Sequence, residues 1–196
     1  MRAQELIESL GICYLSSHLE DFEVGGVSCN SKQISNNFIF VAIKGTHIDG
    51  HEFIQEAIDK GAKAVIVQNS TNSKRLKNLK RASLIVVKDT RKSIANLAAK
   101  FYGNPSSKIK VVGVTGTNGK TTITYLIEAL LKEAGFLPAV IGTVNYRFKD
   151  KIIPSKNTTP GPVELQSLLA DMVKGNISHA ILEVSSHALS QDRTGA

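Results

Sequence analysis

A glycine-rich stretch over residues 114–122 has the residue types and spacing to bind nucleotide phosphates. It reads Val-Thr-Gly-Thr-Asn-Gly-Lys-Thr-Thr and lies between a strand-like apolar run and a helix-like segment, as a phosphate-binding loop requires. Glycines at 116 and 119 would let backbone N–H groups approach phosphate oxygens, and the N-terminus of the following helix would add more N–H groups. We expect Lys120 to act as the catalytic cation at the β- and γ-phosphates, and the Thr121 hydroxyl to ligate Mg²⁺.

The stretch departs at one position from the general motif G-x-x-x-x-G-K-[ST]. Residue 114 is valine, and the nearest glycine on that side is Gly113. An ordinary glycine-rich turn with an exposed lysine is the alternative interpretation, but the Gly-Lys-Thr core and its context favour binding of ATP or GTP. The predicted nucleotide-binding residues are Gly116, Thr117, Asn118, Gly119, Lys120, Thr121 and Thr122.

The chain around this loop alternates apolar runs with segments of helical period, which predicts an α/β fold. The predicted strands are residues 38–43, 64–67, 84–87, 110–115, 139–141 and 179–184. The predicted helices are residues 53–61, 91–102, 120–134 and 162–174. Several strand runs are apolar at every position, as in a parallel sheet that helices cover on both faces.

This pattern predicts two domains. Residues 1–88 would form a small N-terminal α/β domain, and residues 89–196 a parallel-sheet domain of the P-loop type. The second domain shows only three evident strands, whereas sheets usually have about five or six. We therefore expect it to be incomplete in this chain, with open apolar strand edges that cause poor solubility or oligomerisation.

Composition excludes several classes of protein. The chain has 196 residues, 42% of them hydrophobic, which excludes wholesale disorder. No apolar run approaches the roughly 20 residues of a membrane span, and the N-terminus lacks a secretory signal. The distant Cys13 and Cys29 do not make a disulfide framework. We expect a soluble cytoplasmic protein without membrane insertion.

The positive charge of the chain could suggest nucleic-acid binding. There are 24 Lys and Arg against 17 Asp and Glu, a formal net charge of +7. The basic residues are densest over 74–81, in a polar stretch without the interleaved aromatic side chains that stack on bases. A solvated surface is therefore favoured over a nucleic-acid site.

Three stretches together resemble the Mur ligase superfamily, the ATP-dependent amide ligases of peptidoglycan precursor synthesis. Besides the loop, Asn-Thr-Thr-Pro at 157–160 and Glu-Val-Ser-Ser-His-Ala-Leu at 183–189 are similar to signatures of the UDP-MurNAc-tripeptide synthetase branch. Asn-Ser-Lys at 30–32, Phe-Val-Ala-Ile-Lys-Gly at 40–45 and Asp-Gly-His at 49–51 resemble the N-terminal region of that branch. The resemblance covers nearly the whole chain.

The resemblance implies an ATP-dependent acid–amino-acid ligase. ATP would phosphorylate the free carboxylate of D-glutamate in UDP-MurNAc-L-Ala-D-Glu. The amine of meso-diaminopimelate or L-lysine would then attack the acyl phosphate, giving an amide, ADP and phosphate. ATP and Mg²⁺ are the implied cofactors, and the full enzyme is expected to be a monomer. As an N-terminal fragment without the acceptor domain, the 196-residue chain is expected to be inactive alone.

The resemblance also implies a metal site and substrate contacts. Glu183, at the end of a strand beside the loop strand, is the implied metal-linked carboxylate with Thr121, and a plain edge carboxylate is the alternative. Lys32 stands where the branch more often has arginine, which keeps the charge but loses the planar fork. The residues implied to bind the UDP-MurNAc-dipeptide are Cys29, Ser31, Thr46, His47, Ile48, Asn157, Thr158, Thr159, Ser185, Gln191 and Arg193.

Three alternatives remain open at this stage. The chain could belong to another superfamily member, such as a folylpolyglutamate or cyanophycin synthetase. It could be a non-catalytic module that binds a nucleotide or a UDP-sugar. A nucleic-acid-binding P-loop protein is the weakest alternative, since only the charge supports it.

Overall fold

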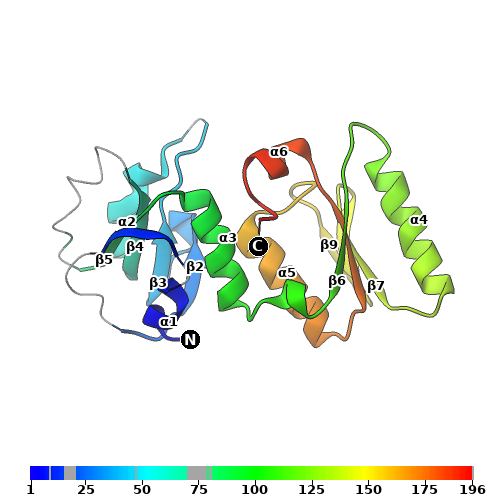
Figure 1. Cartoon of the computed structure of the whole chain (residues 1–196), viewed down its shortest axis with the longest axis horizontal. Coiled ribbons are helices and arrows are strands. Elements are labelled where there is room, and N and C mark those ends of the chain that lie inside the picture. Colours follow the sequence, from blue (N-terminus) through cyan, green and yellow to red (C-terminus); the bar gives the residue numbers. More distant parts are fainter. Residues whose placement is uncertain (9, 16–20, 47, 70–78, 80, 196) are drawn as a thin grey trace. The chain divides into compact units, whose positions relative to one another are not determined.

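The computed structural model describes residues 1–8, 10–15, 21–46, 48–69, 79 and 81–195. The chain divides into two compact units, Met1–Phe101 and Tyr102–Ala196, and each contains a sheet with helices (Figure 1). In the described part of the chain, the helices are too short or too polar to cross a membrane.

The described part of the first unit contains a mixed five-stranded sheet in the order β1-β5-β4-β3-β2. Four strands run parallel: β2 (Gly26–Ser28), β3 (Phe38–Val41), β4 (Ala62–Gln68) and β5 (Ser83–Val87). At one edge, β1 (Ile12–Leu15) pairs antiparallel with β5. The predicted strands β3, β4 and β5 are confirmed, whereas β1 and β2 were not predicted.

The four parallel strands of this sheet are mostly buried on both faces, as continuous apolar runs predict, whereas the edge strand β1 is exposed. On one face, α2 (Ile54–Asp59) packs against alternate residues of β3, β4 and β5. A short helix, η2 (Gly50–Phe53), precedes α2, so the predicted helix over 53–61 is confirmed in shortened form. Two more short helices lie in the described part of this unit, α1 (Ala3–Ile7) and η1 (Ser31–Gln33).

The boundary between the units differs from the predicted one after residue 88. Helix α3 (Thr90–Phe101) contacts β2, β4 and α1, and thus belongs to the first unit. Its apolar stripe explains this placement, since Ile94, Leu97 and Ala98 are at most 1% exposed. Burying that stripe against the first sheet moves the boundary to residue 101.

The second unit also contains a mixed sheet, with the order β6-β10-β7-β8-β9 among the described residues. The predicted strands β6 (Lys110–Val114), β7 (Pro138–Ile141) and β10 (His179–Glu183) are confirmed, and they run parallel. The predicted parallel strands are thus present, but the sheet has two further strands that were not predicted. A hairpin, β8 (Asn145–Phe148) and β9 (Lys151–Pro154), adds two antiparallel strands beside β7.

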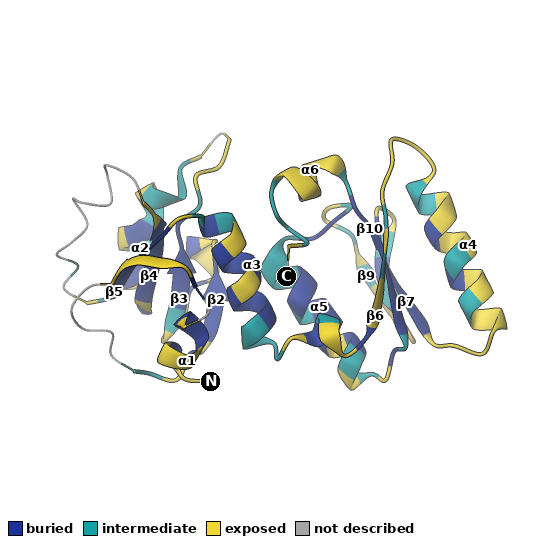
Figure 2. Ribbon diagram, in the orientation of Figure 1, coloured by how far each residue is buried: buried dark blue, intermediate teal, exposed yellow. Residues whose placement is uncertain are grey.

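Helices α4 (Lys120–Glu133) and α5 (Pro162–Lys174) cover opposite faces of this second sheet (Figure 1). Helix α5 buries Leu165, Leu169 and Met172 in the core of the unit. Helix α4 contacts β6, β7 and β10 but leaves much of its surface exposed (Figure 2), including Leu126 and Leu130. The short helices η4 (Pro105–Ser107) and α6 (Ser186–Ser190) complete the described elements.

A charged cluster anchors α4 to the hairpin. Glu128 of α4 is 7% exposed and forms an ion pair with Arg147 of β8, whose Nη1 also donates to Asn145 Oδ1 at 2.9 Å. Lys132 Nζ lies 2.9 Å from Glu128 Oε1, and the Arg147 guanidinium stacks 4.2 Å from the centre of the Tyr125 ring. Burial raises the pKa of Glu128, but the hydrogen bonds from Arg147 and Lys132 outweigh this effect and hold its pKa below the ordinary value.

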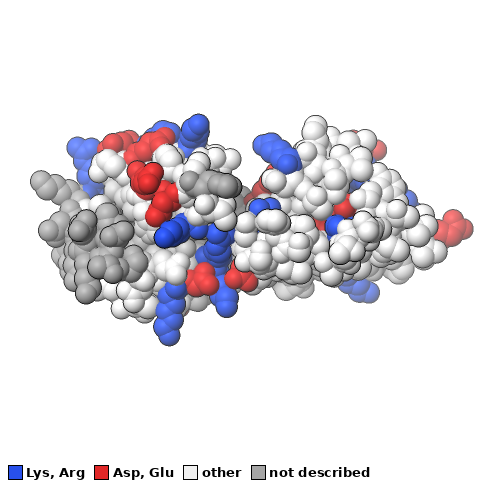
Figure 3. All heavy atoms as spheres, turned by 90° about the horizontal axis from the view of Figure 1, so that it is seen from above, with Lys and Arg blue, Asp and Glu red and all other residues white. Residues whose placement is uncertain are grey.

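Acidic side chains lie among the basic ones on the face of the first unit that Figure 3 draws. Of the basic cluster predicted over residues 74–81, Arg81 is exposed, and Lys74, Arg75, Lys77 and Lys80 lie outside the described residues. Cys13 and Cys29 are both free and exposed.

Candidate functional site

Three adjacent parallel strands of the second unit bring three segments to one edge of the sheet. The loop 115–119 follows β6, Glu183 ends β10, and residues 142–143 follow β7. The register pairs Val114 with Glu183, and Ile141 with Leu182. Ligands of open α/β sheets bind at such carboxyl ends, so this edge is the candidate site.

Both glycines of the loop have a positive φ. Gly116 has a φ of +147° and Gly119 one of +78°, a region that residues with a side chain rarely adopt. The departure from the general motif at Val114 also has a structural explanation. Val114 is still part of β6, and its carbonyl accepts from Val184 N–H at 2.8 Å, so a valine fits there without strain.

Lys120 begins α4 and is held over the loop. Its Nζ donates to the carbonyl oxygens of Gly116 at 2.9 Å and Thr117 at 3.4 Å. The N-terminus of a 14-residue helix adds unpaired N–H groups and the positive end of its dipole. These residues border a hollow of about 300 Å³, which is lined by residues 117–122, Thr143, Thr158, Glu183 and Ser185. The lysine and the helix N-terminus make the rim of this hollow suitable for anionic oxygens.

Glu183 is 1% exposed, and its carboxylate faces the first turn of α4. Thr121 Oγ1 donates to its Oε2 at 3.0 Å, and Thr143 donates twice, from Oγ1 to Oε2 at 2.8 Å and from its N–H to Oε1 at 3.2 Å. The two predicted metal ligands, Thr121 and Glu183, therefore lie together.

A hydroxyl and a carboxylate are the hard oxygen donors that Mg²⁺ prefers, so these residues fit that ion. Mg²⁺ usually binds through one or two protein ligands and completes its shell with phosphate oxygens and water.

The predicted substrate residues of this unit lie beside Glu183. Thr158 Oγ1 is 3.1 Å from Thr143 Oγ1, while Asn157 is exposed. Thr159 is only 1% exposed, and its hydroxyl donates to the Glu183 carbonyl at 2.7 Å and accepts from Ser185 N–H at 3.0 Å. The hydroxyl of Thr159 therefore fastens its loop to the end of β10.

Arg193 and Gln191 form one hydrogen-bonded group with this loop. Arg193 Nη1 donates to the Thr159 carbonyl at 3.1 Å, and its Nε and Nη2 both donate to Gln191 Oε1, at 3.0 and 2.7 Å. Ser185 caps α6 by accepting from Ala188 N–H at 3.2 Å. The structure thus links Thr158, Thr159, Ser185, Gln191 and Arg193, with Asn157 next to Thr158 in the chain. Of these residues, Thr158 and Ser185 line the hollow and form one wall of the site.

The candidate residues of the first unit follow two adjacent parallel strands. Cys29 and Ser31 follow β2, whereas Thr46 and Ile48 follow β3, so both pairs start from the same edge of the sheet. Cys29, Thr46 and Ile48 are exposed, and His47 lies outside the described residues.

Ser31 differs from these three because it is buried. Its hydroxyl donates to Glu56 Oε2 at 2.9 Å, and Lys60 Nζ bonds both Glu56 Oε1, at 2.6 Å, and the Ser31 carbonyl, at 3.2 Å. The Ser31 hydroxyl is thus engaged with α2 in this structure.

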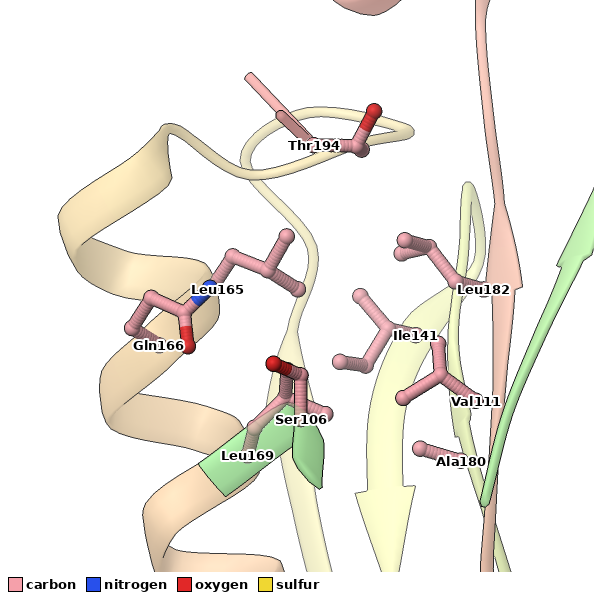
Figure 4. Close-up of a pocket in the computed structure, with 9 residues that line it drawn as sticks. All are labelled: Ser106, Val111, Ile141, Leu165, Gln166, Leu169, Ala180, Leu182 and Thr194. Carbon is pink, nitrogen blue, oxygen red and sulfur yellow. The ribbon is translucent and has the colours of Figure 1, made fainter. Parts of the chain in front are cut away.

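A second hollow of the second unit, of about 340 Å³, has a different character (Figure 4). It lies between α5 and the sheet, and its lining is mostly aliphatic with no charged side chain. It therefore offers no group for acid–base or phosphate chemistry. Its lining residues are Ser106, Val111, Ile141, Leu165, Gln166, Leu169, Ala180, Leu182 and Thr194.

The sequence predictions missed Gly142 and Thr143. Thr143 contributes both its N–H and its hydroxyl to Glu183, and a Cβ on Gly142 would lie 2.3 Å from Glu183 Oε1. One signal could have found them, since both directly follow a predicted buried strand, where parallel sheets place ligand-binding groups.

Two family profiles match the chain, and together they span most of it. The profile described as "Mur ligase middle domain" matches residues 114–196, and that described as "Mur ligase family, catalytic domain" matches residues 23–102. Among curated proteins, the UDP-N-acetylmuramoyl-L-alanyl-D-glutamate--2,6-diaminopimelate ligase of Geobacter sulfurreducens is 44% identical over 171 residues. That match covers 87% of this chain and 33% of the relative, so the chain spans about a third of the length of such relatives.

Two solved structures extend the comparison. The structure titled as a UDP-N-acetylmuramoyl-L-alanyl-D-glutamate--2,6-diaminopimelate ligase superposes with a TM-score of 0.75 at 26% identity, covering 98% of this chain and 37% of that one. The MurF ligase from Thermotoga maritima in complex with ADP gives a TM-score of 0.51 at 28% identity, covering 82% of this chain and 32% of that one.

Proposed function

Because this chain belongs to the Mur ligase family, we propose that it supplies the UDP-substrate-binding and ATP-binding parts of a peptidoglycan precursor ligase. The reaction is the ATP-dependent joining of a diamino acid to UDP-MurNAc-L-Ala-D-Glu. The names of the relatives support this branch, and the acceptor they name, 2,6-diaminopimelate, is the one we propose here. One observation carries the proposal: the loop lysine, the Thr121–Glu183 pair and the wall around Thr158 all meet at one sheet edge.

The second unit would bind ATP at the loop 116–122. Backbone N–H groups and Lys120 would receive the phosphates, with Lys120 turning from the loop carbonyls towards the transferred phosphoryl group. The Thr121 hydroxyl has a single proton, which it donates to Glu183, so its oxygen lone pairs are left for a cation. Bound there, Mg²⁺ would neutralise charge on the phosphate oxygens during transfer.

The neighbouring wall would hold the acceptor of the phosphoryl group. The D-glutamate carboxylate of the UDP-MurNAc-dipeptide attacks the γ-phosphorus and releases ADP, and the amine then displaces phosphate from the acyl phosphate to give the amide. We propose that Asn157, Thr158 and Ser185 contact this substrate directly. Thr159, Gln191 and Arg193 would support these contacts by holding the segment 157–160 in place.

The first unit would bind the UDP end of the same substrate. Cys29, Thr46 and Ile48 are the exposed groups we propose for it, with His47 between the last two. Ser31 would contact the substrate through its backbone, or its hydroxyl would leave Glu56 and bond to the substrate instead. ATP and a nucleotide-linked sugar are substrates of the cytoplasm, and we propose that the protein works there as a monomer.

Calorimetric titration of the chain with Mg-ATP and with UDP-MurNAc-L-Ala-D-Glu tests this function. We expect both ligands to bind, and Lys120→Ala to weaken ATP binding. Lys174→Ala removes an equally positive but 80% exposed side chain at the end of α5, and should leave ATP binding unchanged. A folded chain that does not bind the muramoyl dipeptide would refute the branch, and ATP binding insensitive to Lys120→Ala would refute the nucleotide site.

A further inference from the structure

Thr143 directly follows β7 and supplies most of the contacts to the Glu183 carboxylate. Of the three donors that the described residues give to this carboxylate, two belong to Thr143: the hydroxyl at 2.8 Å from Oε2 and the N–H at 3.2 Å from Oε1. The third is the Thr121 hydroxyl, at 3.0 Å from Oε2. We propose that Thr143 is a positioning residue that holds Glu183 for magnesium-dependent nucleotide binding, an inference that rests on the ATP site proposed above.

Hydrogen-bond accounting shows how the hydroxyls must be oriented. Each threonine hydroxyl has one proton to donate, and a carboxylate oxygen can only accept. A carboxylate is a stronger acceptor than a hydroxyl, so Thr143 donates to Glu183 and the hydroxyl of Thr158, 3.1 Å away, donates to Thr143. The hydrogen bonds from Thr158 to Thr143 and from Thr143 to Glu183 connect the proposed substrate wall to the carboxylate beside the phosphate-binding loop.

The residue before Thr143 makes room for this arrangement. A Cβ added to Gly142 would lie 2.3 Å from Glu183 Oε1 and 2.8 Å from its Cδ, far closer than van der Waals contact allows. The Gly-Thr pair therefore acts as a unit, in which Gly142 admits the carboxylate and Thr143 fixes its two oxygens. Since Glu183 is 1% exposed, water does not readily replace a donor that is removed.

The difference between nucleotide affinities with and without Mg²⁺ tests this role on the 196-residue chain. A non-hydrolysable ATP analogue is titrated calorimetrically in EDTA and in excess Mg²⁺, and Mn²⁺ binding in the nucleotide complex is followed by electron paramagnetic resonance. Thr143→Val keeps the shape of the side chain but removes the hydroxyl, Thr143→Ala removes it without the β-branch, and Thr143→Ser retains it. Outer-shell partners of metal ligands typically affect metal affinity by about 10- to 100-fold.

We expect Thr143→Val and Thr143→Ala to lose about tenfold or more of the affinity gained from Mg²⁺, with the EDTA affinity unchanged. Thr143→Ser should keep most of the gain. An unchanged gain in both hydroxyl-free variants would overturn the proposal. An equal loss in EDTA and in Mg²⁺ would overturn it too, because that is the signature of general distortion. If the unmodified chain bound the nucleotide but gained nothing from Mg²⁺, or failed to bind it at all, the proposed ATP site itself would fail, and the role of Thr143 with it.

Discussion

Replacing Gly142 by alanine is the sharpest perturbation that this site offers. The new Cβ would lie 2.3 Å from Glu183 Oε1, whereas an ordinary contact needs about 3.4 Å, so the carboxylate has to move by roughly 1.1 Å (3.4 minus 2.3). Its three hydrogen bonds measure 2.8, 3.0 and 3.2 Å. A displacement of that size breaks at least one of them.

The expected loss of stability follows from the free energy needed to displace the carboxylate. A hydrogen bond to a charged group contributes about 1.5–3 kcal/mol, and overpacking a filled site costs about 1–3 kcal/mol. These effects overlap, so we expect Gly142→Ala to lower the free energy of unfolding of the second unit by about 2–4 kcal/mol. The Mg²⁺-dependent gain in nucleotide affinity should fall as well, because Glu183 no longer faces Thr121 in the same way.

Urea unfolding followed by circular dichroism, together with nucleotide titrations, measures both effects. Gly11→Ala is the matched control, because Gly11 has an ordinary backbone conformation and no atom within 4 Å of an added Cβ. That control should stay within about 0.5 kcal/mol of the unmodified chain, as surface substitutions usually do. A Gly142→Ala variant as stable as the control and equally responsive to Mg²⁺ would show that the carboxylate is not confined as described.

Three further predictions concern other parts of the second unit. Glu128→Gln should destabilise the chain by about 2 kcal/mol at neutral pH, less than the 3–5 kcal/mol of a fully buried broken pair. Because the folded pKa of Glu128 lies below the ordinary 4.5, the ion pair contributes stability above that value and loses it as the pH falls through the folded pKa. Urea unfolding at several pH values should therefore show that the difference in stability between the unmodified chain and Glu128→Gln shrinks below pH 4.5. A difference that stays constant with pH would argue against the ion pair. Val114→Gly restores the general loop motif but should bring no gain in calorimetric ATP affinity, and a loss of about 0.5–1 kcal/mol in stability, because residue 114 belongs to a strand. Leu130→Glu, at a side chain that is 69% exposed on α4, should reduce self-association in sedimentation experiments without lowering stability; equal sedimentation of both chains would contradict this.

The position of the glycine-rich loop between a strand and a helix could be predicted from the sequence because its signals are local. Gly116, Gly119 and Lys120 lie within five residues of one another, and the strand and helix on either side are strongly patterned. The same locality explains why the strands with continuous apolar runs were found. The position of Glu183 at the edge of the sheet could be predicted because this residue ends such a strand.

Features that depend on sheet order could not be found in this way. Thr143 matters only because β7 is the neighbour of β10, and that neighbourhood is not written in any local run of residues. The hairpin of β8 and β9 was missed because its turn contains no glycine, with Lys149 itself taking a φ of +50°. The predicted boundary after residue 88 differs from the observed one for a related reason, since an apolar stripe such as that of α3 does not by itself indicate which sheet it covers.

The three hydrogen bonds of Glu183 also have a consequence for the entropy of ligand binding. Fixing a glutamate side chain in one rotamer costs up to about 1.5–2 kcal/mol of conformational entropy. Here Thr121 and Thr143 fix the carboxylate through hydrogen bonds that form when the second unit folds. A cation that binds this carboxylate meets a side chain with little rotational freedom left to lose, so more of the interaction energy remains available as affinity.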